Sequence, residues 1–233
     1  MITSKDNPRL KLVRKLHDRS SRDKLGLFFV EGEDAVAAAT AEPVDLLRAG
    51  EDVDPKLLAA AATAPHPPRV IAVYRRADLP GWEERPATLA LWRLSDPGNV
   101  GTLVRTADAF GAAVALSDGC ADPTSPKALR ASAGSIWRVP IGPWDACVDS
   151  TQTRVALVAH GGEPLASLDP AGRVVFLLGS ERAGLPAGVE RDVDVTIPIE
   201  GAESLNVAAT GAIALYELGR RRAPAGAQTF RQT

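Results

Sequence analysis

The stretch Ile197-Pro198-Ile199-Glu200-Gly201-Ala202-Glu203-Ser204-Leu205-Asn206-Val207 leads directly into a long apolar segment that ends at Arg220–Arg222. It closes a strand-like run with a proline and continues through a short acidic loop that contains a glycine. Ser204 and Asn206 then stand at the start of a predicted helix. Ser204 is a candidate N-cap of that helix, which is the simple structural interpretation. The alternative is a ligand site, because open α/β proteins bind ligands at helix N-termini that follow strand ends.

From Thr88 onward, apolar strand-like segments alternate with helix-compatible ones. The predicted strands are Thr88–Leu94, Ala112–Ser117, Trp137–Ile141, Arg154–Ala159, Val174–Leu178 and Val193–Ile199, and the predicted helices are Asn99–Phe110, Lys127–Ser132, Trp144–Thr151 and Ser204–Arg222. Continuous apolar strands that alternate with helices are typical of a mostly parallel sheet covered on both faces. We therefore predict an α/β domain over residues 88–233.

The first eighty residues contain shorter elements and predict a smaller α/β domain. The expected strands are Leu27–Val30, Val44–Leu47 and Arg69–Val73, with helices at Ala35–Ala41 and Pro55–Ala62. Pro80, Gly81 and Pro86 interrupt the pattern and predict a linker over residues 81–87. Residues 1–25 are rich in lysine and arginine, which indicates either a local nucleic-acid surface or an ordinary solvated helix face.

Composition excludes several other classes of protein. The net charge of −2 over 233 residues does not by itself indicate a nucleic-acid binder. Cys120 and Cys147 are isolated, and His17, His66 and His160 lie in unrelated contexts, so the sequence predicts neither a metal site nor a Ser-His-Asp triad. The N-terminus lacks the apolar core of a signal peptide, and no apolar run could span a bilayer. We expect a cytoplasmic protein.

Two further loops have the same design as residues 197–207. Residues 95–111 follow a strand, turn at Asp96-Pro97-Gly98 and open a helix in which Asn99 is a candidate cap. Arg105, inside that helix, is either a surface residue or a ligand for a phosphate or a reacting hydroxyl. In residues 176–186 a strand ends at Gly179, where the backbone can approach a ligand, and Glu181 follows at the loop tip. No strand precedes a dinucleotide-binding fingerprint, and no Walker A sequence occurs.

Together these loops resemble the signature motifs of the SPOUT class of RNA methyltransferases, specifically the TrmH/SpoU family of ribose 2′-O-methyltransferases. Residues 96–111 resemble motif 1, residues 178–185 resemble motif 2, and residues 197–208 resemble motif 3. Residues 127–135 resemble the family's Ser-Ala-Gly segment. Residues 4–11 and 28–32 resemble the opening of the family's accessory substrate-binding domain. Arg182 and Ile199 depart from the residues common in the family, but neither departure removes a functional group.

The resemblance implies a C-terminal trefoil-knotted parallel-sheet domain, which general topology rules would not have suggested. It also implies a homodimer that binds S-adenosylmethionine in the knot, with the active site near the subunit interface. Three sets of residues follow from it: cofactor-binding Gly179, Ile197, Ile199 and Leu205; catalytic Asn99, Arg105, Glu181, Ser204 and Asn206; and RNA-binding Lys5, Arg9, Lys11, Arg14, Lys15 and Arg130.

The implied reaction transfers a methyl group to a ribose 2′-hydroxyl, in ribosomal rather than transfer RNA because of the accessory domain. A guanidinium stays protonated, so we expect Arg105 to hold a phosphate and stabilise charge on the 2′-oxygen rather than to act as a base. Alternatives are a transfer RNA ribose methyltransferase, a non-catalytic RNA-binding or ribosome-assembly protein, a TrmD-type base methyltransferase and a nucleotide-dependent oxidoreductase. The Ser-Leu-Asn motif favours ribose chemistry, and the missing fingerprint disfavours the oxidoreductase.

Overall fold

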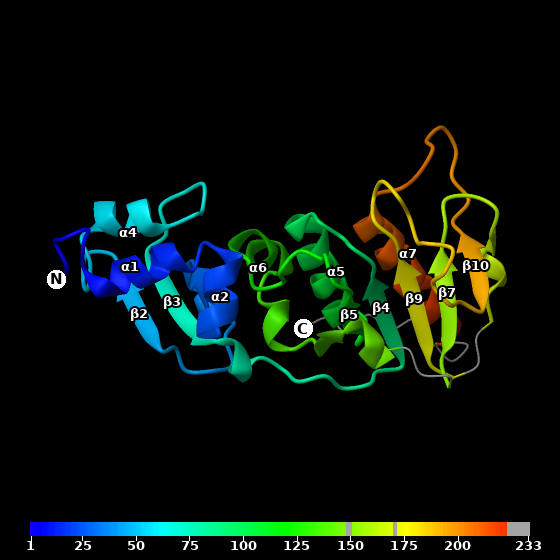
Figure 1. Cartoon of the computed structure of the whole chain (residues 1–233), viewed down its shortest axis with the longest axis horizontal. Coiled ribbons are helices and arrows are strands. Elements are labelled where there is room, and N and C mark those ends of the chain that lie inside the picture. Colours follow the sequence, from blue (N-terminus) through cyan, green and yellow to red (C-terminus); the bar gives the residue numbers. More distant parts are fainter. Residues whose placement is uncertain (148–150, 170–171, 223–233) are drawn as a thin grey trace.

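The computed structural model describes residues 1–147, 151–169 and 172–222. Within them the chain forms two separate β-sheets, a three-stranded antiparallel one and a seven-stranded one in which every pairing is parallel. The two sheets lie at different positions along the long axis of an elongated molecule, with the N-terminal residues at one end (Figure 1). None of the helices in the described ranges is both long and apolar enough to cross a membrane.

The N-terminal unit, residues 1–78, is built on the smaller sheet, with strand order β1-β3-β2. Its elements are α1 (Pro8–Lys15), α2 (Arg19–Leu25), β1 (Leu27–Glu31), α3 (Glu33–Ala37), β2 (Asp45–Arg48), α4 (Pro55–Ala61), β3 (Val70–Arg75) and the 3-10 turn η1 (Arg76–Asp78). Successive side chains of a strand point to opposite faces of the sheet. Phe29 and Ile71 therefore join the core under α1 and α4, whereas Phe28 and Tyr74 face the rest of the chain.

The C-terminal unit, residues 87–222, is built on the larger sheet, with strand order β6-β5-β4-β9-β7-β10-β8. Its strands are β4 (Ala87–Leu91), β5 (Ala113–Leu116), β6 (Ile141–Pro143), β7 (Thr153–Leu157), β8 (Glu163–Pro164), β9 (Val174–Leu178) and β10 (Val193–Thr196). Its helices are α5 (Pro97–Ala109), α6 (Pro126–Ser132) and α7 (Val207–Arg222), with 3-10 turns η2 (Ser135–Trp137), η3 (Trp144–Cys147) and η4 (Leu165–Ser167). The prediction of an α/β fold with a parallel sheet is confirmed.

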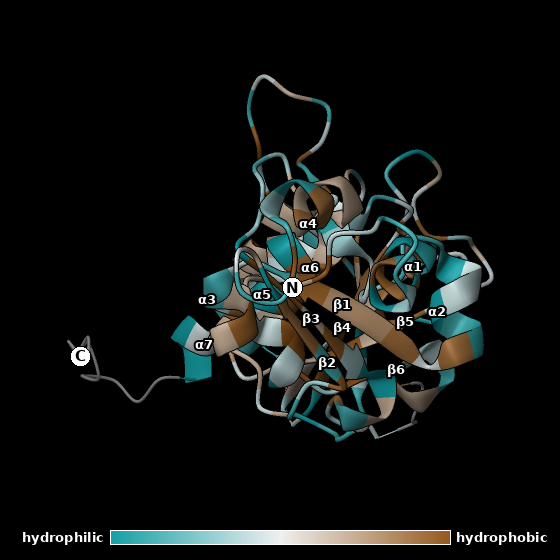
Figure 2. Ribbon diagram, turned by 90° about the vertical axis from the view of Figure 1, so that its left-hand side faces the viewer, coloured by the Kyte–Doolittle hydropathy of each residue, from teal (hydrophilic) through white to brown (hydrophobic). Residues whose placement is uncertain are grey.

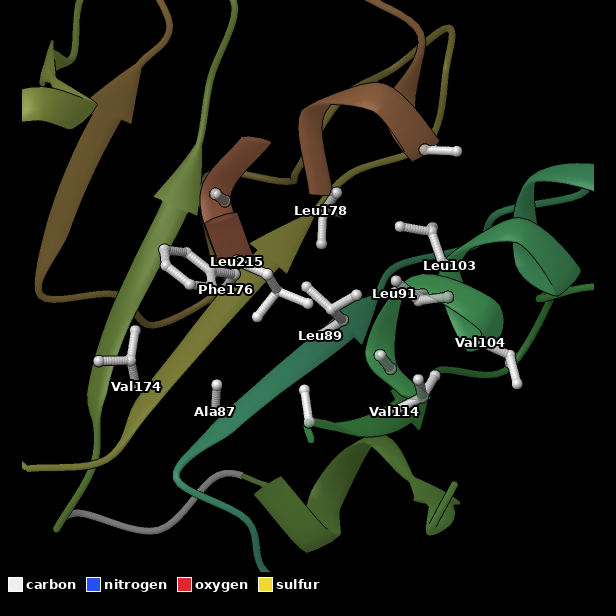
Figure 3. Packing of buried hydrophobic residues seen from close by; sticks show 14 of the residues in the cluster. Ala87, Leu89, Leu91, Leu103, Val104, Val114, Val174, Phe176, Leu178 and Leu215 are labelled. Carbon is white, nitrogen blue, oxygen red and sulfur yellow. The ribbon is translucent and has the colours of Figure 1, made fainter. Parts of the chain in front are cut away.

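Helices α5 and α7 cover one face of this sheet. Leu89, Phe176 and Leu178 point from β4 and β9 into a core that Leu103 of α5 and Leu215 of α7 complete (Figure 3). Apolar ribbon is prominent among the strands labelled in Figure 2, including β4 of this sheet. The opposite face carries smaller side chains, including alanines of β4, β5 and β7, and is covered by η3 and loop residues rather than by long helices.

Some predicted elements differ from the structure. The strand expected at Trp137–Ile141 begins only at Ile141, because Trp137 lies in η2 and packs against Phe28 and Tyr74 of the N-terminal unit. The helix expected at Trp144–Thr151 is the short turn η3, and residues 148–150 lie outside the described residues. The final helix starts at Val207, three residues later than predicted.

Candidate active site

The three sequence motifs meet at the edge of the large sheet where its parallel strands end. The loops that follow β7, β9 and β10 rise together there (Figure 1, upper right) and enclose a pocket of about 610 Å³. The pocket is lined by residues 157–160, 178–182, 184, 195–197, 199, 203–207 and 210. All four predicted cofactor residues, Gly179, Ile197, Ile199 and Leu205, contribute to this lining, as do Glu181, Ser204 and Asn206.

A chain of hydrogen bonds joins the three motifs. The Nδ2 atom of Asn206 donates to Oδ1 of Asn99 at 3.2 Å, and Nδ2 of Asn99 donates to Oε1 of Glu181 at 2.8 Å. Asn206 comes from the start of α7, Asn99 from the first turn of α5 and Glu181 from the loop after β9. Each of the two hydrogen bonds joins residues more than eighty positions apart in the sequence, and the three side chains share one polar cluster beside the pocket.

The helix caps differ from the sequence expectations. Asp96 rather than Asn99 caps α5, because its carboxylate accepts a hydrogen bond from the Asn99 amide at 3.0 Å. Asn206 rather than Ser204 caps α7, since its Oδ1 atom accepts from the Ala208 amide at 2.8 Å. With Asp96 as the cap, the Asn99 side chain is free to bind Glu181 and Asn206. Ser204 remains an exposed hydroxyl on the pocket wall.

Electrostatics reinforce the Asp96 cap. The Lys127 ammonium of α6 lies 2.7 Å from Oδ2 of Asp96. This bond, followed by the one from the Asn99 amide, holds the pKa of Asp96 below its ordinary value. Asp96 is therefore ionised near neutral pH, and a carboxylate at a helix N-terminus is stabilised by the helix dipole. Asp96 thus binds the Asn99 amide within α5 and the Lys127 ammonium of α6, and these two bonds fix the first turn of α5.

The motif 2 loop depends on a glycine. Ser180 and Gly184 exchange two backbone hydrogen bonds, at 3.2 and 2.9 Å, so the loop folds back on itself immediately after β9. A Cβ atom on Gly179 would lie 2.2 Å from the carbonyl carbon of Gly184 and 2.4 Å from the Leu185 nitrogen. These are backbone atoms that cannot rotate away, so the loop closes only with glycine at position 179.

Arg105 is not brought into the pocket lining. It lies on α5 about 9 Å of helix rise beyond Asn99, and its side chain is exposed. Within the described part of the chain, the Arg105 guanidinium has no hydrogen bond and no ion pair. Most other arginines there are engaged, for example Arg138 with Asp108 and Arg154 with Asp192. The Arg105 guanidinium is thus available to an external anion.

The pocket also contains residues that the sequence did not single out. His160, treated as an isolated histidine, lines the pocket together with Arg182 and Thr196. The position of His160 in the sequence could have indicated this role. His160 follows β7, and parallel strands end at the same edge of a sheet, where ligands bind. Its partners in the pocket come from distant loops, so no local sequence pattern relates it to them.

The predicted RNA contacts lie on the N-terminal unit, apart from Arg130. Lys5, Lys11 and Lys15 are exposed, and Lys11 pairs with Asp6 at 3.1 Å. Arg9 binds Asp45 through Nε at 2.9 Å yet keeps 41% of its side chain exposed, and Arg14 donates to the Lys5 carbonyl.

Arg130 also connects the two units. Its guanidinium donates to Glu31 at 3.0 Å and to the Thr63 hydroxyl at 2.9 Å, while 37% of its side chain stays exposed, so its contact with RNA stays a prediction. Its position on a short helix within the Ser-Ala-Gly segment gave no sign of these partners, which lie in the other unit.

Comparison with known proteins identifies the family. The sequence profile of the SpoU rRNA methylase family matches residues 86–216, which contain all three motifs. The chain belongs to the SpoU rRNA methylase family. A similar member is the 23S rRNA (guanosine(2553)-2′-O)-methyltransferase RlmP of Bacillus subtilis, which is 32% identical over 93% of this chain and 98% of its own length. The 23S rRNA (uridine(2479)-2′-O)-methyltransferase of Streptomyces viridochromogenes is 32% identical over 67% of this chain and 61% of its own length.

Solved structures of methyltransferases resemble the chain as a whole. The AdoMet-bound rRNA methyltransferase from Sinorhizobium meliloti superposes with a TM-score of 0.83 at 29% identity, covering 96% of this chain and 98% of its own. The SpoU methyltransferase AviRb from Streptomyces viridochromogenes, in complex with AdoMet, gives a TM-score of 0.80 at 27% identity over 93% of this chain and 98% of its own. The likeness therefore extends to the N-terminal unit, beyond the residues that the family profile matches.

Proposed function

We propose that this protein transfers the methyl group of S-adenosylmethionine to a ribose 2′-hydroxyl of ribosomal RNA. The observation that carries the proposal is the cluster of Asn206, Asn99 and Glu181, which unites three SpoU motifs beside one pocket. The 23S rRNA 2′-O-methyltransferase RlmP of Bacillus subtilis, which matches nearly the whole chain, supports both the substrate class and the reaction. With ribosomal RNA as its substrate, we place the enzyme in the cytoplasm.

The pocket fits the proposed cofactor. Its volume of about 610 Å³ falls within the range of small-molecule sites, roughly 300–1,000 Å³. Leu178, Val195 and Ile197 give apolar walls, and the bare backbone at Gly179 gives amide and carbonyl groups for an adenine. The bound cofactor would supply an electrophilic methyl group. Gly179, Ile197, Ile199 and Leu205 would hold it.

The remaining residues act on the RNA. Glu181 and Ser204 present oxygen acceptors inside the pocket, where they can orient a ribose hydroxyl. Asn99 and Asn206 hold Glu181 in place through their hydrogen bonds. Arg105 binds the phosphate of the target nucleotide and stabilises the negative charge that develops on its 2′-oxygen. As the bond between the 2′-oxygen and the methyl carbon forms, the bond from that carbon to sulfur breaks, S-adenosylhomocysteine leaves and the hydroxyl proton is released. Positioning and charge stabilisation serve this exchange.

The domain organisation belongs to the same proposal. We assign residues 1–80 to an RNA substrate-binding domain, 81–87 to a linker and 88–233 to a methyltransferase domain, of which residues 148–150, 170–171 and 223–233 lie outside the described residues. Strand β9 lies between β4 and β7, although it follows both in the sequence. This insertion of a later strand between two earlier ones is compatible with the trefoil knot that we propose, which would include α7.

The proposed homodimer predicts the effect of one surface change. Phe110, at the C-cap of α5, and Ile213 and Tyr216 of α7 are large apolar residues that remain exposed, with 42%, 37% and 59% of their surface accessible. Clustered exposed apolar residues mark interaction surfaces. We expect Tyr216→Glu combined with Ile213→Glu to convert a dimer into a monomer in light scattering. Val44→Glu, at an equally exposed apolar residue of the other unit, is the control and should leave the mass unchanged. A wild-type monomer would contradict the proposal.

The basic face of α1 makes a second prediction. Reversing the charges of Lys11, Arg14 and Lys15 to glutamate should weaken binding to ribosomal RNA and reduce the steepness of its salt dependence, because fewer phosphates are neutralised. Filter binding at several salt concentrations measures both quantities. Lys56→Glu on α4 is the control for a change of charge alone. Unchanged affinity in the triple variant would show that this face is merely solvated.

One experiment tests the activity itself. The purified protein is incubated with labelled S-adenosylmethionine and in vitro transcribed 23S rRNA, and the product is mapped by its resistance to alkaline cleavage at 2′-O-methylated positions. We expect a single methylated ribose. Methylation of transfer RNA instead would favour the transfer RNA alternative, and cofactor binding without transfer to either RNA would favour the non-catalytic one. Neither alternative has support comparable to that from the full-length relative RlmP.

A further inference from the structure

The two units of the chain share a hydrophobic core. Phe28 and Tyr74 of the small sheet pack against Trp137 of η2, with ring centroids 5.6 and 4.8 Å apart, respectively. Leu129 of α6 and Ile136 complete this cluster. All five side chains are buried. The N-terminal unit is thus docked on the C-terminal unit by apolar packing, in addition to the linker that joins them.

A buried carboxylate stabilises one end of the contact between the two units through hydrogen bonds. Asp122, in the loop before α6, is 7% exposed. It accepts hydrogen bonds from Nε of Arg22 at 2.8 Å and from Arg76 at 2.6 Å, both from the N-terminal unit. Thr124 binds its other oxygen through its amide and hydroxyl, at 2.8 and 2.7 Å. Burial alone would raise the pKa of Asp122, but these partners lower it below its ordinary value, so the group is ionised.

A second carboxylate forms hydrogen bonds at the other end of the contact between the two units. The Glu31 side chain is 3% exposed and accepts hydrogen bonds from the Thr63 amide and hydroxyl, at 2.5 and 2.7 Å, and from Arg130 of α6 at 3.0 Å. In the β1–β3 pair Glu31 lies opposite Ile71, whereas Arg76 follows the pair of Leu27 with Arg75. The two ionic contacts therefore lie at opposite ends of the same strand pair, and the aromatic cluster lies between them.

The docked unit is connected to the active site through α6. A Cβ atom on Gly101 of α5 would lie 2.2 Å from the Ala128 carbonyl of α6, so the two helices pack backbone against backbone. Lys127 of α6 binds Asp96, which caps α5 at the turn that positions Asn99. The helix that receives the N-terminal unit is the same helix that holds the first turn of α5.

We propose that Asp122 and Glu31 are positioning residues that set the N-terminal unit at a fixed distance and orientation from the catalytic pocket. RNA bound on the N-terminal unit then presents its target ribose to Glu181 and Arg105. The fixed distance between the two units thereby determines which nucleotide of the bound RNA is methylated. Binding at two linked sites gains affinity only when the geometry lets both be occupied at once. This inference rests on the proposed function.

The test compares two RNA lengths in two variants. After the methylated nucleotide has been mapped, a long fragment that reaches both units and a short fragment around the target are prepared. Asp122→Asn leaves the Arg22 charge buried without its partner, and Glu31→Gln removes the charge opposite Arg130. For the long fragment we expect both variants to show Kd and KM raised about tenfold, with kcat unchanged at saturation. For the short fragment, and for S-adenosylmethionine in calorimetry, we expect no change.

Asp108→Asn is the matched control, because Asp108 forms an ion pair with Arg138 entirely within the C-terminal unit. It should leave the affinities for both fragments unchanged. If the Asp122→Asn variant does not fold and therefore fails to bind the cofactor, the affinities of the Glu31→Gln variant for the two fragments test the inference. Folded variants that bind both fragments like the wild type, or that lose affinity for both equally, overturn the inference. A wild type that binds 23S rRNA but methylates no position in it overturns the proposed function instead. In that case the Kd values of the wild type and the variants for whole 23S rRNA still test the positioning.

Discussion

Replacing Arg105 with alanine is expected to lower the rate of methyl transfer by at least about a hundredfold, the size of effect seen when a group that stabilises developing charge is removed. The Arg105 guanidinium is exposed and, within the described part of the chain, has no partner. Its loss therefore leaves no buried group unsatisfied and should not disturb the fold. S-adenosylmethionine affinity should stay within about twofold, because Arg105 does not line the pocket.

Single-turnover transfer to 23S rRNA and calorimetric titration of the cofactor measure these two quantities. Arg105→Lys tests the chemistry further: it keeps the charge but loses the planar fork, so we expect only partial recovery. Arg220→Ala, on α7, is the control for removing an arginine that pairs within its own helix. An Arg105→Ala protein that transfers methyl groups at the wild-type rate would show that another group faces the 2′-oxygen.

Replacing Gly179 with alanine is expected to weaken S-adenosylmethionine binding by at least about a hundredfold, because forced overpacking displaces the backbone. The added methyl group would meet the Gly184 and Leu185 backbone at 2.2 to 2.6 Å. The loop can accept it only by breaking the Ser180–Gly184 pairing, which moves the pocket wall. Titration calorimetry measures the affinity, and thermal unfolding shows whether the fold persists.

Gly188→Ala is the matched control for that variant. Gly188 belongs to the same connection between β9 and β10, but a Cβ atom there would meet nothing within 4 Å. Its backbone does not adopt a positive φ angle, so alanine is tolerated without strain. We expect cofactor affinity to stay at the wild-type level. Equal losses in both variants would mean that the loop tolerates no alanine at all, and the role assigned to Gly179 would be wrong.

Much of the site could be predicted because its residues occur in compact loops. Gly179, Ile197 and Leu205 follow strand ends, and a parallel sheet brings such ends to one edge. What could not be predicted is which polar groups meet. The Asn99 side chain was a candidate cap by its position, yet the Asp96 cap frees it to bind Glu181. That choice depends on a strand eighty residues away.

The sequence alone determined the alternation of apolar strands with helices, the order of the three motifs and the chemistry they resemble. These are local properties, set by periodicity and by the residues at strand ends and helix starts. The tertiary structure decided which charged side chains form ion pairs with buried partners and which stay unpaired at the surface. Arg22 and Arg130 look like exposed basic residues in the sequence, but each is paired with a buried carboxylate about a hundred positions away. Burial and pairing depend on how separate units dock, and no local pattern encodes those distances.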